Sequence, residues 1–203
     1  MADRDPWAPV LEFWFGELSD GLAQPEIRQR WFEANPEFDN ACRRFESLLD
    51  DARDGALDAW LVSPRGTLAY ILLTDQLPRN IHRGAAQAYA WDELARDAAA
   101  EGIRQRQDRA LGWDERSFFY MPFEHSEDLL DQHTAVGLFS ALRDEAPGPL
   151  RETIGNSLRY AHQHRDVITR FGRFPHRNAV LGRASSEEEQ AFVAAGDGFG
   201  QLA

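Results

Sequence analysis

The sequence predicts an all-α protein that folds as one domain over its 203 residues. Apolar residues recur at helical spacing along most of the chain, and no segment alternates polar and apolar residues as a half-buried strand does. Hydrophobic residues make up 43% of the chain, a share too high for a disordered protein. We therefore expect about eight helices with short links, an ordered core over residues 6–195 and a frayed tail over residues 196–203.

Four helices are expected in the first half of the chain. Residues 6–15 and residues 36–53 each carry an apolar stripe at helical spacing. A proline suited to a first helical turn opens the next helix, which continues through residues 68–77. Residues 87–101 are periodic and rich in alanine, and we expect Gly102 to end that helix.

Four more helices are expected in the second half. Residues 114–121 form a short helix that should end there, because a proline follows. Ser126 is the expected N-cap of a helix that runs to about Asp144, with acids in its first turn. Residues 151–171 carry the longest periodic pattern, and overlapping capping boxes at two serines open a last helix over residues 185–193. Helical pairs recur at roughly the thirty to forty residues typical of repeat folds, which favours a stack of helical hairpins.

Composition and charge exclude several classes of function. The net charge is -12, which opposes binding to nucleic acids and to anionic membranes. All 22 basic residues are arginine, so chemistry that needs a catalytic or phosphate-binding lysine is excluded. The single cysteine cannot form an intrachain disulfide, and no apolar run approaches the roughly 20 residues of a membrane span. The absence of a signal-like N-terminus favours the cytoplasm.

Two similar arginine-rich segments are the first candidates for a binding site. Residues 75–84 and residues 173–183 both contain a proline, then an Arg-Asn pair, then another arginine beside a glycine. A guanidinium binds carboxylate or phosphate through two parallel hydrogen bonds. The candidate ligand-binding residues are Gln76, Arg79, Asn80, Arg83, Arg173, Arg177 and Asn178. Two interpretations stay open: both segments feed one anion-binding pocket, or these side chains pair with carboxylates and pin helix ends.

Local charge favours the first interpretation. Residues 151–183 hold seven arginines and two acids, a balance of +5 inside an acidic chain. Such a basic segment attracts small anions. The alternative is a long solvated helix matched to an acidic neighbour.

Histidines and carboxylates supply candidate catalytic groups. His125 could transfer protons while Glu127 orients it, although the same acids also suit the start of a helix. His176 is a second proton-transfer candidate. Asp75 ends an apolar stripe and needs an arginine partner, either Arg79 or Arg177. No metal-binding motif is present and no metal is assigned, although Glu127 and Asp128 could instead hold a hard divalent ion; the cofactor stays unknown.

His164 differs from these candidates, because it aligns with apolar residues of the long helix. We expect it to be a hydrogen-bonded core residue.

Several motifs together resemble a known family. They are Val10–Gly16, Trp31-Phe32, Asp75–Asn80, Met121–Asp128 and Phe171–Asn178. The chain resembles the bacterial domain-of-unknown-function family 924 from about Val10 to Phe192. The resemblance implies an all-α fold similar to the tetratricopeptide superfamily and carries no established activity. It groups the polar positions Asp75, Gln76, Arg79, Asn80, Arg83, His125, Ser126, Glu127, His164, Arg173, His176, Arg177 and Asn178. Two residues depart from it: Glu124 replaces an apolar residue, often Met, and Leu77 replaces Phe.

Two functions from different classes follow. The first is the binding of a small anion, a phosphate or carboxylate, by an Arg/Asn/His pocket, with hydrolysis as a candidate reaction. The alternative is a tetratricopeptide-like helical module that binds a peptide or protein partner, with the Arg-Asn motifs structural. Whether the chain is an enzyme stays open, and nucleic acid is the least favoured partner.

Overall fold

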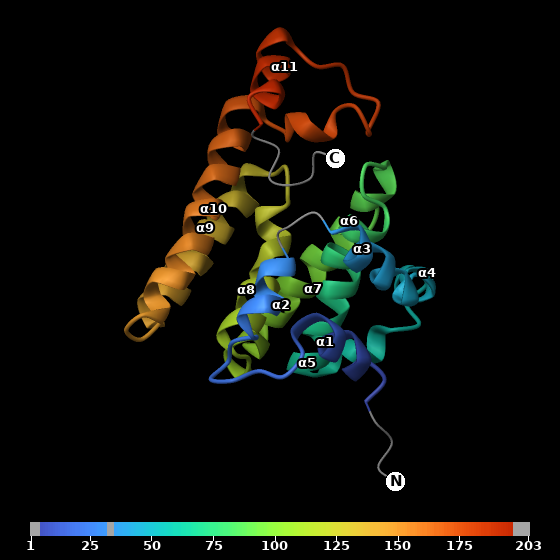
Figure 1. Ribbon diagram of the computed structural model, residues 1–203, viewed down its shortest axis with the longest axis vertical. Helices are drawn as coiled ribbons and strands as arrows, with labels where there is room; N and C mark the ends of the chain where they lie inside the picture. Colours follow the sequence, from blue (N-terminus) through green and yellow to red (C-terminus); the bar gives the residue numbers. More distant parts are fainter. Residues whose placement is uncertain (1–4, 32–34, 197–203) are drawn as a thin grey trace. The chain divides into compact units, whose positions relative to one another are not determined.

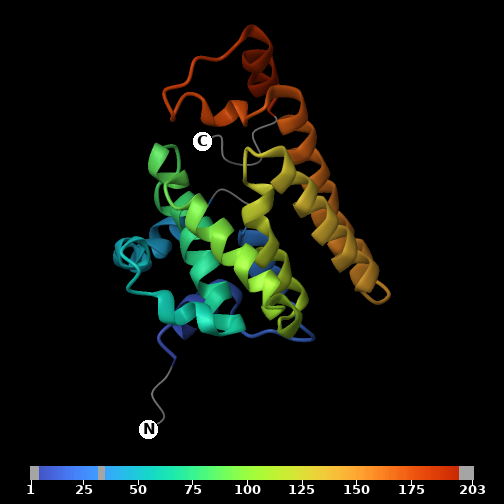
Figure 2. The same ribbon diagram turned by 180° about the vertical axis from the view of Figure 1, so that it is seen from behind.

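The computed structural model describes residues 5–31 and 35–196, and within them the fold is all-α, as predicted. An isolated bridge between Ser19 and Leu22 is the only extended pairing there. The chain forms two compact units (Figures 1 and 2). Unit 1 comprises residues 1–83 and 87–119, and unit 2 comprises residues 84–86 and 120–203. The prediction that they make one domain stays a prediction.

The helices of unit 1 are α1 (Ala8–Phe15), α2 (Pro25–Arg30), α3 (Pro36–Cys42), α4 (Ser47–Arg53), α5 (Pro64–Ile71), α6 (Leu77–Ile81), α7 (Asp92–Arg104) and most of α8 (Trp113–Glu124). Short 3₁₀ turns link several of them, and one of these turns divides the helix expected over residues 36–53. Helix α2 was not predicted from the sequence.

A fully buried helical segment forms the centre of unit 1. Every residue from Gly66 to Ile81 is buried, along α5, a single π-helical turn (Leu72–Gln76) and α6. Helices α1, α3, α4 and α7 all pack against this segment. The polar residues on it are therefore held in the interior, where each needs a hydrogen-bonding partner.

The π turn explains how this helix continues past a proline. The N–H of Leu77 bonds to the carbonyl of Leu72, five residues back, and Pro78 follows immediately. Proline has no N–H to donate and its ring crowds the preceding turn, so a wider turn relieves the conflict. The helix predicted over residues 68–77 is thus confirmed and extends to Ile81.

Two of the predicted helix ends are wrong. One is the end of α7, in unit 1, and the other is the end of α8, the helix that continues from unit 1 into unit 2. Gly102 lies inside α7, which begins at Asp92 and ends at Arg104. A Cβ on Gly102 would lie 2.5 Å from the Phe119 ring, so the glycine permits close packing and does not end the helix. Pro122 lies inside α8, where burial of its neighbours Met121 and Phe123 favours continuation to Glu124.

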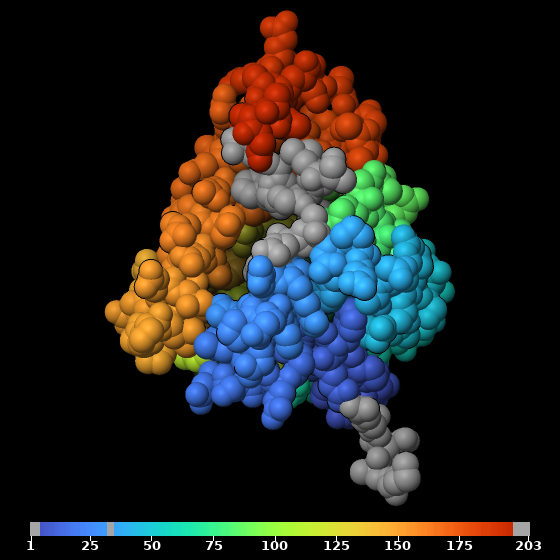
Figure 3. Space-filling model, in the orientation of Figure 1, coloured from blue at the N-terminus to red at the C-terminus, as the bar shows by residue number. Residues whose placement is uncertain are grey.

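Unit 2 contains an antiparallel helical hairpin. Helices α9 (Leu129–Glu145) and α10 (Leu150–Phe171) pack along their length (Figures 1 and 2). Figure 3 shows the surface of α10 in orange. The N-cap of α9 is Asp128 and not Ser126, because the Asp128 carboxylate accepts the N–H of Leu130.

The C-terminal part of unit 2 is a loop held by side-chain hydrogen bonds, followed by a short helix. A 3₁₀ turn (Pro175–Arg177) follows α10, and α11 (Glu187–Ala194) starts with the capping box predicted from Ser186 and Glu189. The predicted tail contains Gly196, and its remaining residues lie outside the described part of the chain. Among the described helices, none combines the length and hydropathy that crossing a membrane requires.

Candidate functional site

In unit 1, Arg79 is the centre of a buried ionic network. Its Nη1 and Nη2 donate to the two carboxylate oxygens of Asp92 at 2.8 and 2.9 Å, and Nη1 lies 3.2 Å from Oδ1 of Asp75. Burial by itself lowers the pKa of Arg79, but the charges of Asp75 and Asp92 outweigh it and raise that pKa. The predicted pairing of Asp75 with Arg79 is confirmed, and Gln76 donates to Asp75 at 2.5 Å.

Arg83 makes a second pair with a carboxylate in unit 1. Its Nε and Nη2 donate to Asp39 of α3 at 2.8 and 3.0 Å, and Nη2 also donates to Asn80. The Nδ2 of Asn80 donates to the carbonyl of Gln76, one turn earlier. Arg83 and Asn80 therefore join α6 to α3. This agrees with the second interpretation of the sequence, in which these side chains pair with carboxylates and fix helix ends.

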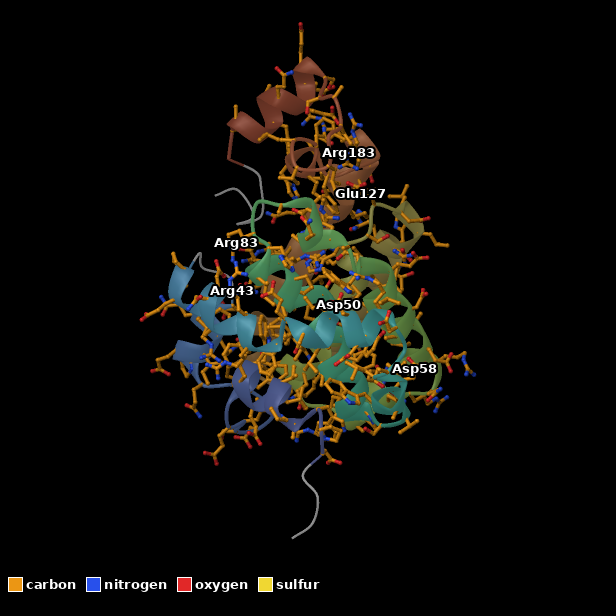
Figure 4. All side chains as sticks on the ribbon, turned by 90° about the vertical axis from the view of Figure 1, so that its right-hand side faces the viewer. Arg43, Asp50, Asp58, Arg83, Glu127 and Arg183 are labelled. Carbon is orange, nitrogen blue, oxygen red and sulfur yellow. The ribbon has the colours of Figure 1, made fainter. Side chains whose placement is uncertain are left out.

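The corresponding segment of unit 2 is pinned in the same way. Arg173 donates from Nε and Nη2 to Glu189 at 2.6 and 2.8 Å. Arg183 donates to both carboxylate oxygens of Glu127 at 2.7 and 2.9 Å, and Figure 4 labels this pair. Asn178 is fully buried, accepts from Arg183 and donates to Ser185. These contacts fix the loop between α10 and α11.

Both carboxylates of these pairs have a lowered pKa. Hydrogen bonds from Arg173 and from the backbone N–H of Ser186 lower the pKa of Glu189 to about 2. Burial acts to raise the pKa of Glu127, but hydrogen bonds from Arg183 and from the N–H of Phe174 outweigh it and lower that pKa. Glu127 thus accepts charged donors at neutral pH, and its contacts tie it to Arg183 and not to His125.

Three imidazoles of unit 2 lie close together, two of them against the ring of Phe174. The ring centroids of His164 and His176 lie 5.6 and 5.5 Å from that of Phe174. The centroid of His125 lies 6.2 Å from that of His164. The guanidinium carbon of Arg177 lies 4.4 Å from the Phe174 centroid, over the ring. We call these five residues the histidine cluster; it contains half of the chain's six histidines.

His164 is buried and forms a close pair with Glu124. Its Nδ1 lies 3.0 Å from Oε1 of Glu124 and 2.9 Å from the carbonyl oxygen of Tyr160. The expectation of a hydrogen-bonded core histidine is confirmed. The carboxylate partner was not predicted from the sequence, although the unusual acid at position 124 was a signal for it.

The end of α8 holds Glu124 and His125 in place. The side chain of Gln132 in α9 is fully buried and donates to the carbonyls of Glu124 and Ser126 at 2.6 and 2.8 Å. Ser126 donates to Asp131 at 2.6 Å. These bonds satisfy carbonyls that a helix end leaves without partners.

The structure thus distributes the predicted site residues over the two units. Asp75, Gln76, Arg79, Asn80 and Arg83 belong to unit 1, whereas His125, Glu127, Arg173, His176, Arg177 and Asn178 belong to unit 2. That both arginine segments feed one site stays a prediction. Among the described residues, no group of three or more His, Cys, Asp or Glu side chains is arranged to hold a metal ion.

Comparison with known proteins assigns the family. The profile of a family described as bacterial protein of unknown function, DUF924, matches residues 10–197. The chain belongs to this family. A solved structure of a protein of unknown function from Agrobacterium tumefaciens is 38% identical to this chain, covers 93% of this chain and 97% of its own, and superposes with a TM-score of 0.79. No curated protein matches the chain.

Proposed function

We propose that this DUF924 protein binds a small anionic molecule, a phosphate or a carboxylate, at the histidine cluster of unit 2. The observation that carries the proposal is that two imidazoles and one arginine contact the ring of Phe174, and that a third imidazole, His125, lies beside His164. Imidazole is the side chain that gains and loses a proton near neutral pH, and a guanidinium keeps its charge throughout. The cluster therefore combines a fixed positive charge with groups that can exchange protons with a ligand.

The other candidate arginines support this choice by their contacts. Arg79, Arg83 and Arg173 each donate two hydrogen bonds to a carboxylate of the chain itself, and so does Arg183, which was not a candidate. An external anion would have to displace that carboxylate from a bidentate pair. We therefore centre the proposed site on Arg177, His125 and His176, and a site that also includes Arg79, Arg83 and Arg173 stays a prediction.

Binding of inorganic phosphate tests the proposal. Isothermal titration calorimetry and thermal shift should show binding to the wild-type protein, stronger at pH 6 than at pH 8, because protonated imidazoles attract the anion. His125→Asn and His176→Asn should each weaken binding. His133→Asn, at an exposed position of α9, is the matched control and should bind as the wild type does. Unchanged binding by both cluster variants would overturn the proposal, as would no binding of phosphate or acetate to the wild type.

The helical module for a peptide partner is the second candidate. It is favoured by the α9–α10 hairpin, on which Leu130 and Tyr160 are 74% and 55% exposed. Exposed apolar side chains on a helical pair are typical of peptide-binding surfaces. Leu130→Ser with Tyr160→Ser should abolish capture from a peptide library while preserving the fold. The tetratricopeptide-like relationship and a cytoplasmic location stay predictions.

A further inference from the structure

We infer that the exposed face of α10 binds a second copy of this chain, as an antiparallel pair of α10 helices related by a two-fold axis. The residues that carry the inference are Glu152, Asn156, Arg159 and Tyr160, all of them in unit 2. The inference does not depend on the anion binding proposed above, because none of these residues belongs to the histidine cluster.

Helix α10 packs on α9 and leaves one long face open to solvent. Its buried side includes Leu158, whereas Glu152, Asn156 and Arg159 are exposed and Tyr160 keeps 55% of its surface exposed. Spacings of four and three residues place positions 152, 156 and 159 in one stripe along the helix, with position 160 at its edge. A large aromatic side chain therefore lies open on this face, where burial against a partner would stabilise it.

Two opposite charges on this face are left without partners inside the chain. Among the described residues, neither the Glu152 carboxylate nor the Arg159 guanidinium makes a hydrogen bond or an ion pair. Their separation of seven residues is two helical turns, roughly 10 Å along the axis, so they are too far apart to pair with each other. Farther along α10, Arg170 is by contrast paired with Glu188.

A two-fold axis through Asn156 brings each of these charges to its opposite in the second copy. In an antiparallel pair with this axis, position 153 of one helix lies level with position 159 of the other. Glu152 and Arg159 lie on the same side of the stripe, so Glu152 of each copy meets Arg159 of the other. The symmetry makes this ion pair twice, which is the self-complementarity that a two-fold interface requires.

The other side chains of the face fit the same register. Tyr160 lies on the opposite side of the stripe from Arg159, where it meets the half-buried Thr153 of the second copy. Asn156 lies on the axis, and its amide both donates and accepts, so the two copies of Asn156 can bond to each other. A single polar residue of this kind sets the register of paired helices.

The size and charge of the interface predict a weak, reversible dimer. A single pair of helices buries a small area, which is typical of transient association. The net charge of -12 makes two copies repel at long range, and physiological salt screens that repulsion. Local pairs of opposite charge then decide which faces meet.

Sedimentation equilibrium of the full chain at physiological salt tests the inference. The wild-type mass should rise from the chain mass of 23.1 kDa toward twice that value as the concentration increases from roughly 1 µM to roughly 1 mM. Glu152→Arg and Arg159→Glu each place like charges opposite each other at both pairs, so each should weaken association by about tenfold or more. Arg151→Glu is the matched control: it changes an exposed charge that points away from the stripe, and it should associate as the wild type does.

An equimolar mixture of the Glu152→Arg and Arg159→Glu chains separates an interface from a structural effect. One chain of each kind restores opposite charges at both pairs, so the mixture should associate about as tightly as the wild type although neither variant does so alone. Damage to the fold of either variant could not produce this rescue.

Three results would overturn the inference: a wild type that stays monomeric throughout, charge variants that associate as tightly as the wild type, or a mixture that does not associate. A monomeric wild type that captures peptides through Tyr160 would also overturn it and would favour the peptide-binding module. Binding of inorganic phosphate should be the same in all of these variants, so a monomer that binds phosphate overturns only this inference.

Discussion

At the scale of single residues, arginine is the residue whose role the sequence left most open. The sequence identified Arg83 and the segment that contains Arg183, but their partners lie 44 and 56 positions away in the chain. A pair of that separation is created by the fold and has no local signature. Asp75 and Arg79 are four positions apart on one helix, so their pairing could be predicted. The sequence motifs therefore identified the polar residues, whereas the tertiary structure determines which of them pair with carboxylates and join neighbouring elements.

Glu189 should make the stability of the protein depend on pH in the acid range. Its pKa is about 2 in the folded protein and about 4.3 in an unfolded chain. The stabilisation is present above pH 4.3 and is lost as the pH falls toward 2, because the unfolded chain binds the proton more tightly. In Glu189→Gln, the fall of Tm between pH 5 and 2 should be shallower than in the wild type.

The matched control is Glu188→Gln, which removes an exposed carboxylate one position earlier. Its Tm should follow the wild-type pH dependence. An equally shallow profile in both variants would show that the Arg173 pair is not the cause.

Cys42 should not react while the protein is folded. The side chain is fully buried, and burial raises the pKa of the thiol to about 12. A thiolate is the reactive form, so at pH 8 an aromatic disulfide reagent should modify Cys42 only at the rate at which unit 1 opens. Stopped-flow absorbance with and without denaturant measures this rate. Fast modification in native buffer would contradict the burial of the thiol.

At the scale of elements, helical periodicity and capping were predictable, and helix ends were not. The faces of α1 and α10 and the capping box of α11 agree with the sequence patterns. The errors at Gly102 and Pro122 arise because local propensity competes with packing that the sequence does not show. Gly102, which the sequence suggested as a helix end, packs closely against Phe119 inside α7. Pro122 is tolerated inside α8, where its neighbours are buried.

Two glycine substitutions separate these effects. Alanine is the better helix former, so Gly137→Ala in α9, where a Cβ would meet nothing within 4 Å, should stabilise the protein by about 0.5–1 kcal/mol. Gly102→Ala should instead destabilise it by about 1–3 kcal/mol, because the Cβ would meet the Phe119 ring at 2.5 Å. Urea unfolding measures both changes. Stabilisation by Gly102→Ala would contradict the close packing of α7.

At the scale of the whole molecule, more of the positive charge of the basic segment is paired with carboxylates than its sequence suggested. Residues 151–183 carry +5. Arg165, Arg170, Arg173 and Arg183 are nevertheless paired with carboxylates, three of them outside that segment. Of the other three arginines, Arg151 and Arg159 lie on α10 and Arg177 lies in the histidine cluster, and the chain as a whole keeps its charge of -12.

This charge distribution predicts selectivity by ligand size. A small anion needs only the cluster, whereas a polyanion must approach an acidic surface over a long range. The wild-type protein should not shift duplex DNA in a gel at physiological salt while it binds inorganic phosphate in calorimetry. Tight, salt-dependent DNA binding would contradict the local character of the positive charge.

The most direct test of the central claim is histidine NMR during titration with inorganic phosphate. Side-chain imidazole resonances of all six histidines should be recorded at pH 6.5, with assignments from single His→Asn variants. We predict that the resonances of His125, His164 and His176 shift and saturate together, while those of the exposed His133 stay constant. Shifts that are equal across all six histidines, or absent from the histidine cluster, would contradict an anion site around Phe174.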